Sequence, residues 1–172
     1  AAVMILVPLG MILSYRMVRR RDDAESALKL SEERFNLAVA GSNDGLWDWH
    51  ILGREVYYSP RFKQLLGFRP DEFENSVNSI TSRLHPEDVE HVRRAFSDHL
   101  EQDKVFDVEM RALTKSGQYR WFRGRGQSVR DAEGIPVRMA GSITDITDRQ
   151  IAAADLFSEK ERAQVTLVSI AD

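Results

Sequence analysis

The spacing of hydrophobic and polar positions divides the chain into a helical beginning, an alternating middle and a helical end. Near the start, small or apolar side chains recur at steps of four and three residues, and this spacing predicts a helix with a weak heptad seam: Ala24, Leu28, Ser31, Phe35, Ala38. Turn-forming residues at 41–45 end this helix. A parallel partner helix could pair along the seam.

The middle of the chain contains the period-two segments of a sheet. Residues 46–51 place Trp47, Trp49 and Ile51 on one face, and residues 56–59 follow as a short partner strand. Three more strands begin at residue 105 and are separated by turns at 115–117 and 131–134, each with a glycine suited to positive φ. Successive strands should therefore pair as antiparallel hairpins, in an α+β domain with one antiparallel sheet.

Helical pieces connect the second and third strands. Phe62, Leu65 and Leu66 share a face, Gly67 ends that piece, and residues 70–73 restart it. Residues 86–88 place a proline and two acids at the start of a clearer helix, whose expected buried stripe is Val89, Val92, Phe96 and Leu100.

The last helix starts where the strand pattern stops. Thr147 and Gln150 have the spacing of a capping box, and Asp148 lies in the expected first turn. Beyond them the three- and four-residue steps continue through Ala153, Leu156, Lys160, Ala163, Leu167 and Ile170. This pattern fits a two-stranded coiled coil, or a single helix docked on its own sheet.

The first fifteen residues carry no charge and are followed by Arg16, Arg19, Arg20 and Arg21. This order is typical of a stop-transfer segment facing the cytoplasm, although fifteen residues are too few to span a bilayer. We interpret residues 1–18 as the end of a transmembrane helix in a bacterial inner membrane, with the domain on the cytoplasmic side. A buried or tag-derived helix is the alternative.

Charge and composition exclude several kinds of chemistry. With 24 Lys and Arg against 27 Asp and Glu, the chain lacks the basic surplus of a nucleic-acid-binding protein. It has no cysteine, which excludes disulfides, thiolate metal sites and a cysteinyl flavin adduct. No catalytic motif or metal-binding spacing is present, so we expect no enzyme activity within these residues.

Four short motifs together resemble the PAS domain family, in particular the bacterial subgroup of the PAS fold-3 kind whose trailing strands are called PAC. They are Ser31-Glu32-Glu33-Arg34-Phe35, Leu84-His85-Pro86-Glu87-Asp88, Tyr119-Arg120-Trp121-Phe122 and Asp145-Ile146-Thr147. The resemblance implies a five-stranded antiparallel sheet in the order 2-1-5-4-3 with short helices on one face. It also implies a sensory and dimerisation module, in which Asp145 and Thr147, followed by Gln150, couple the sheet to the output helix.

The resemblance places a linker helix at 19–41, the PAS/PAC domain at 42–148 and an outgoing helix at 149–172. Residues 33–44 align without gaps on residues 161–172, which indicates the start of a second PAS domain. Residues 159–167 are similar to linkers in bacterial proteins that end in GGDEF and EAL domains, which make and break cyclic di-GMP. A sensor histidine kinase and a ligand-free dimerisation scaffold are the alternatives, and a homodimer through both flanking helices is expected in each case.

A ligand pocket above the sheet is the main functional prediction. Its candidate lining residues are Trp47, Trp49, Phe62, Leu66, Phe96, Phe106, Val108, Phe122, Gly124 and Ile143. The alternative is that the aromatic side chains fill this space as core, which favours the absence of a cofactor. Haem with His99 as axial ligand and a non-covalent flavin are left open, as is a small-molecule ligand.

Overall fold

The computed structural model describes residues 3–170, and it divides the chain into two compact units, residues 1–43 and 44–172. The first unit is the long helix α1 (Val3–Ser42), which ends where Asn43 adopts a left-handed backbone conformation with φ of 60°. Leu28 and Phe35 of the predicted seam are exposed on α1, at 60% each. No helix in the described part of the chain is both long enough and apolar enough to cross a bilayer.

The second unit is built on one antiparallel sheet in the order β2-β1-β5-β4-β3. Its strands are β1 (Gly45–His50), β2 (Glu55–Tyr58), β3 (Phe106–Leu113), β4 (Tyr119–Arg130) and β5 (Pro136–Asp145). Gly117 and Gly134 take positive φ values of 80° and 82° in the two predicted hairpin turns. The predicted fold class and strand order are thus confirmed.

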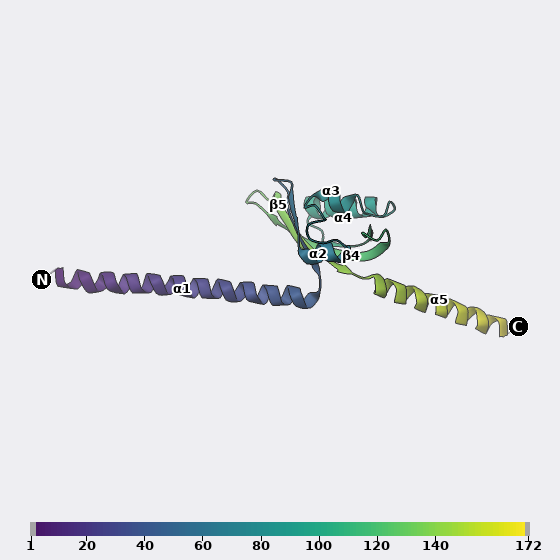
Figure 1. Cartoon of the computed structure of the whole chain (residues 1–172), viewed down its shortest axis with the longest axis horizontal. Helices are drawn as coiled ribbons and strands as arrows, with labels where there is room; N and C mark the ends of the chain where they lie inside the picture. The colour runs from purple at the N-terminus through teal and green to yellow at the C-terminus, as the bar shows by residue number, and fades with distance from the viewer. Residues whose placement is uncertain (1–2, 171–172) are drawn as a thin grey trace. The chain divides into compact units, whose positions relative to one another are not determined.

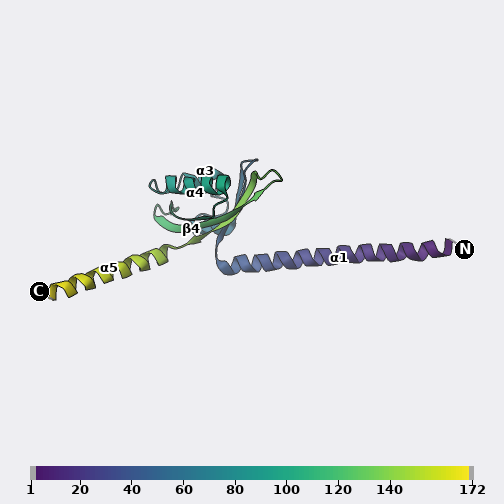
Figure 2. The same ribbon diagram turned by 180° about the vertical axis from the view of Figure 1, so that it is seen from behind.

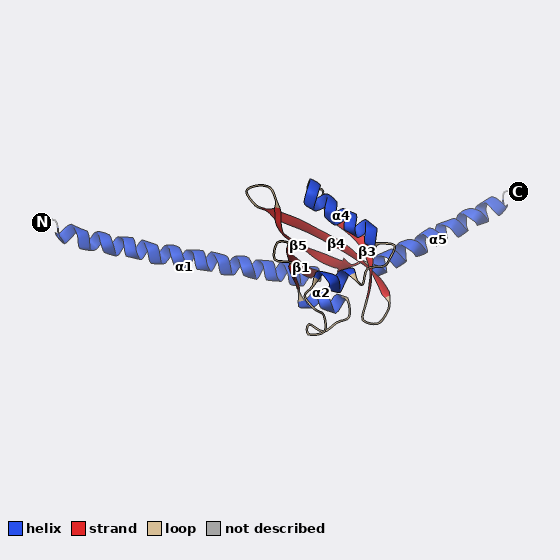
Figure 3. Ribbon diagram, turned by 90° about the horizontal axis from the view of Figure 1, so that it is seen from above, coloured by secondary structure: helices blue, strands red, loops and turns tan. Residues whose placement is uncertain are grey.

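Three helices connect β2 to β3: α2 (Pro60–Leu65), α3 (Val77–Thr81) and α4 (Val89–Gln102). Figure 1 and Figure 2, seen from opposite sides, both place α3 and α4 together over one face of the sheet, and Figure 3 shows α4 from above, beside β4 and β3. Ser59 caps α2 by accepting from the N–H of Phe62, and Ser76 caps α3 in the same way.

Two of the predicted helix positions are wrong. Residues 70–73 form turns rather than a helix, and α4 begins at Val89 instead of residue 86. The carboxylate of Asp88 does not cap α4, because it accepts three hydrogen bonds from the backbone N–H and guanidinium of Arg111 on β3 at 2.7 to 3.0 Å. This contact ties the start of α4 to the sheet.

The core lies between these helices and the sheet. Phe62, Leu66, Ala112, Phe122 and Met139 have at most 1% of their surface exposed. Gly141 allows the indole of Trp47 to approach the sheet closely, since a Cβ there would come within 2.6 Å of the indole and 2.0 Å of the Arg125 carbonyl oxygen.

Helix α5 (Thr147–Ile170) starts at the end of β5, but the predicted capping box is not formed. The hydroxyl oxygen of Thr147 accepts from the backbone N–H of Trp121 on β4 at 3.0 Å, while the N–H of Gln150 donates to the carbonyl of Ile146. The structure describes no side chain before residue 17 or beyond residue 162. The predictions for the apolar run, the later seam positions and the second copy of the internal repeat therefore stay predictions.

Candidate functional site: an apolar cavity and the corner beside it

A cavity of about 380 Å³ lies between the sheet and helices α3 and α4. This volume falls within the range of about 300–1,000 Å³ that is usual for small-molecule sites. The lining residues come from all layers of the domain: Trp47, Trp49, Val56, Tyr58, Phe62, Val77, Ile80, Thr81, Leu84, Val89, Val92, Arg93, Phe96, Phe106, Met110, Gly124 and Ile143.

Seven of the ten predicted pocket residues line this cavity: Trp47, Trp49, Phe62, Phe96, Phe106, Gly124 and Ile143. The other three, Leu66, Val108 and Phe122, are at most 2% exposed and belong to the packed core instead. Gly124 contributes space as predicted, because a Cβ there would meet only the side chains of Met110, Val108 and Phe106, at 3.4 to 3.7 Å.

Sequence reasoning missed the wall formed by β2 and α3. Val56 and Tyr58 alternate on the same face of the sheet as Trp47, so the period-two pattern contained the signal for them. Val77, Ile80 and Thr81 sit on a helix of five residues, which is too short for a helical period to be visible.

Few polar groups reach the cavity wall. The hydroxyl of Tyr58 donates to the carbonyl of Ser76 at 3.1 Å, and burial raises the pKa of this phenol. Trp49 lines the cavity, and its indole Nε1–H is buried without a hydrogen-bond acceptor. A ligand oxygen would supply such an acceptor.

His99 does not serve as the predicted haem ligand. It is 1% exposed, its Nδ1 lies 2.5 Å from the carbonyl oxygen of Lys104, and its Nε2 accepts from the backbone N–H of Ser128 at 3.0 Å. Since Nε2 accepts, the ring proton resides on Nδ1 and donates to Lys104. Both ring nitrogens are therefore engaged, Nε2 with β4 and Nδ1 with the segment that follows α4, and His99 is not among the cavity-lining residues.

The residues present do not fit a flavin either. The polar edge of an isoalloxazine ring needs several hydrogen-bonding side chains, whereas the lining residues that carry polar side-chain atoms are Trp47, Trp49, Tyr58, Thr81 and Arg93. The Tyr58 hydroxyl is already engaged with Ser76. An apolar molecule with few polar groups matches this lining better.

The second part of the site is the corner between β5 and α5, where the predicted relay residues meet. One oxygen of Asp145 accepts from both the N–H and the hydroxyl of Thr147, at 3.0 and 2.6 Å, and the other lies 3.0 Å from the Arg120 guanidinium. The N–H of Ile146 donates to the carbonyl of Trp121 at 2.9 Å. The start of α5 is thus held to the first residues of β4.

Gln150 contributes from the first turn of α5, although not as a cap. Its side-chain amide donates to Glu109 of β3 at 2.6 Å, and Arg149 also pairs with Glu109. Arg123 of β4 pairs with the neighbouring acid of β3, Asp107, and its hydrogen bonds lower the pKa of that carboxyl. Glu109 belongs to the corner instead.

The corner and the cavity share two strands. Ile143, two residues before Asp145 on β5, lines the cavity and lies opposite Gly124 of β4, which also lines it. Phe122 of β4 is opposite Asp145 in the same register. A displacement of these strands by a cavity ligand would therefore reach the residues that hold α5.

Comparison with known proteins agrees with this architecture. A family model described as the PAS fold matches residues 55–143, and the chain belongs to the PAS fold family. It is similar to a solved structure of a sensory box histidine kinase/response regulator from Burkholderia thailandensis, with 39% identity and a TM-score of 0.68, over 76% of this chain and 98% of that one.

Two curated relatives show where such domains occur. The chain is 27% identical to a probable diguanylate cyclase, DgcE, of Escherichia coli over 96% of its own length and 15% of that protein. It is 28% identical to the sensor protein FixL of Bradyrhizobium diazoefficiens over 81% of its own length and 28% of that protein. The chain spans less than a third of these relatives, and it is a sensory domain of the kind found in diguanylate cyclases and sensor kinases.

Proposed function

We propose that this chain is the sensory module of a larger bacterial signalling protein, and that it binds a small apolar molecule in the cavity between α3, α4 and the sheet. The observation that carries the proposal is the cavity itself: about 380 Å³ of space walled by apolar side chains within a folded core. Natural cores are closely packed and contain few voids larger than a water molecule.

The signal would leave through the corner between β5 and α5. A ligand that favours one of two arrangements of β4 and β5 shifts the population of that arrangement, and with it the contacts of Thr147 and Asp145. Helix α5 would then change its pairing with α5 of a second chain. The downstream domain is a diguanylate cyclase or a histidine kinase, as in the relatives, with the former favoured by the linker at 159–167.

A homodimer through α1 and α5 is part of the proposal. Leu28 and Phe35 on α1, and Leu156 and Phe157 on α5, are each 54% to 63% exposed in the single chain. Leu28 and Phe35 are seven residues apart, and exposed apolar side chains at this heptad spacing are typical of helices that pair. Attachment to the inner membrane with the domain in the cytoplasm stays a prediction from residues 1–21.

Native mass spectrometry of the purified chain, combined with an absorption spectrum, tests the proposal. A bound small molecule, or saturable uptake of an apolar probe that quenches Trp47 and Trp49, is expected. A dimer that takes up no probe would instead favour the second candidate, a ligand-free dimerisation scaffold, for which the exposed apolar side chains of α1 are the supporting observation.

A further inference from the structure

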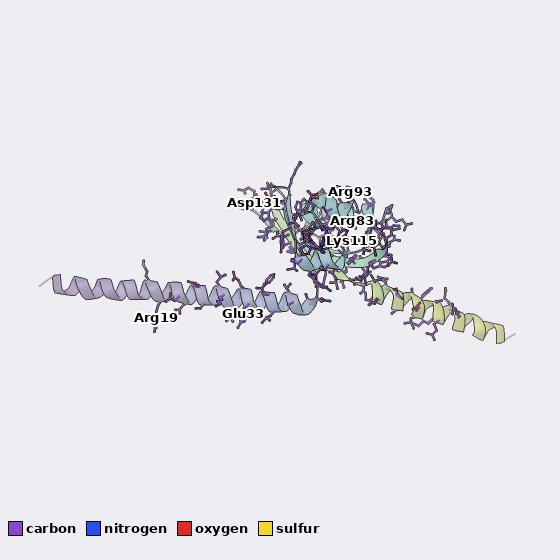
Figure 4. The ribbon with its side chains drawn as sticks, viewed as in Figure 1. Arg19, Glu33, Arg83, Arg93, Lys115 and Asp131 are labelled. Carbon is purple, nitrogen blue, oxygen red and sulfur yellow. The ribbon has the colours of Figure 1, made fainter. Side chains whose placement is uncertain are left out.

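The mouth of the cavity differs from its interior in polarity. Deep wall residues such as Phe62, Val92 and Phe106 are at most 5% exposed. Val77 and Val89, the first residues of α3 and α4, also line the cavity but are 40% and 42% exposed. Arg93, the only charged residue among those that line the cavity, lies one turn along α4 from Val89 with a side chain that is 67% exposed. Figure 4 shows Arg93 on the helical side of the domain.

The guanidinium of Arg93 keeps hydrogen-bonding capacity for a ligand. Its Nε and Nη2 donate to the carboxylate of Glu90 at 3.0 and 2.8 Å, which leaves Nη1 outside this pair. Arg94 also approaches the same carboxylate, at 3.6 Å. Two cations therefore share one anion beside the cavity mouth, and a second anion would be attracted there.

The interior imposes the opposite requirement. A carboxylate buried against these apolar walls would lose its hydration shell, and the indole N–H of Trp49 would replace only one of the lost hydrogen bonds. A headgroup held at the mouth keeps its contact with water and gains a charge-assisted hydrogen bond. The apolar remainder of the same molecule would fill the cavity and be stabilised by each methylene group that leaves water.

From these observations we infer that the ligand is an amphipathic carboxylic acid, whose hydrocarbon chain occupies the cavity and whose carboxylate is held at the mouth by Arg93. The inference rests on the proposed function and adds to it the chemical class of the ligand and the residue that selects it. Arg93 is a specificity residue in this account, because an uncharged chain of equal length would bind without its help.

Two probes with the same carbon chain, decanoate and decan-1-ol, separate the inference from the proposed function. Binding of each to the whole chain is measured by calorimetry and by the fluorescence of Trp47 and Trp49. Arg93→Gln is the test variant, and Arg94→Gln is its matched control, since Arg94 carries the same charge, contacts the same Glu90 and does not line the cavity.

The expected result is that Arg93→Gln weakens decanoate binding about fivefold, the effect of one partly exposed charge-assisted contact, while Arg94→Gln leaves it unchanged. Decan-1-ol should bind all three proteins equally. If both substitutions weakened decanoate binding equally, the role of Arg93 would be overturned. Binding of decan-1-ol without decanoate would refute the acid and leave the apolar sensor intact, whereas binding of neither probe to the unaltered chain would refute both.

Discussion

His99 provides the most direct test of how the helical layer is attached to the sheet. Strand β3 begins at Phe106 opposite Gly126, so β4 extends beyond it by four residues that have no strand on that side. The imidazole of His99 occupies this position and accepts the N–H of Ser128, and its own N–H donates to Lys104. Replacing His99 with leucine would leave both backbone groups without these partners.

The magnitude follows from these two contacts. A buried polar group that loses its partner costs about 1–3 kcal/mol, and the carbonyl of the exposed Lys104 can recover part of its loss from water. We therefore expect His99→Leu to lower the free energy of unfolding by about 2–4 kcal/mol, a large part of the roughly 5–15 kcal/mol of a typical domain. His99→Gln, which retains an acceptor, should lose about half as much.

Urea unfolding of the whole chain, followed by circular dichroism, measures the effect. With a slope of about 1–3 kcal/mol per molar urea, the midpoint for His99→Leu should fall by roughly 1–2 M. His91→Leu is the control, because His91 is exposed on the same helix. If His99→Leu stayed within about 0.5 kcal/mol of the unaltered chain, as an exposed position would, the proposed attachment would be wrong.

Three further predictions concern other contacts. Hydrogen bonds from Arg111 lower the pKa of Asp88, so the stability from this pair is complete above about pH 4 and is lost as the pH falls through the lowered pKa. In unfolding measured across an acid titration, Asp88→Asn should be less stable than the unaltered chain at pH 7, and the difference in the free energy of unfolding should close towards about pH 2. A gap that stayed constant would contradict this. Gly141→Ala should lose about 3 kcal/mol or more, since its Cβ would strike backbone, whereas Gly124→Ala should change thermal stability by less than about 1 kcal/mol; equal losses would contradict the glycine assignments. Thr147→Val should lower the free energy of unfolding by about 1–2 kcal/mol and speed hydrogen exchange at the backbone amide of Trp121, which donates to the Thr147 hydroxyl. An unchanged exchange rate at Trp121 would contradict the corner geometry.

Local patterns in the sequence were sufficient to predict that the strands and the main helices exist. The alternation around Trp47 and in residues 105–113 depends only on which face meets the core, so it predicts the strand and the buried face together. The strand order came from the resemblance to a family. The same alternation identified most of the cavity wall, because a residue that faces the helical layer lies in core or cavity.

Contacts between distant residues account for the errors. The hydroxyl of Thr147 had the spacing of a cap, but it bonds to Trp121, which is 26 residues earlier in the chain. His99 lay at the apolar edge of its helix, and its acceptor role depends on Ser128, 29 residues later. Neither partner has a local signal, because the sheet register decides which backbone N–H remains unpaired.

The central claim is that the cavity and the start of α5 are coupled. Hydrogen exchange at the amides of Trp121, Ile146, Thr147 and Gln150 tests it most directly, since each of them donates to a defined acceptor at the corner. With the chain saturated by a cavity probe that is confirmed to bind, exchange at these four amides should change severalfold, while exchange at the β1–β2 turn stays the same. A saturated cavity with unchanged exchange at all four amides would contradict the account.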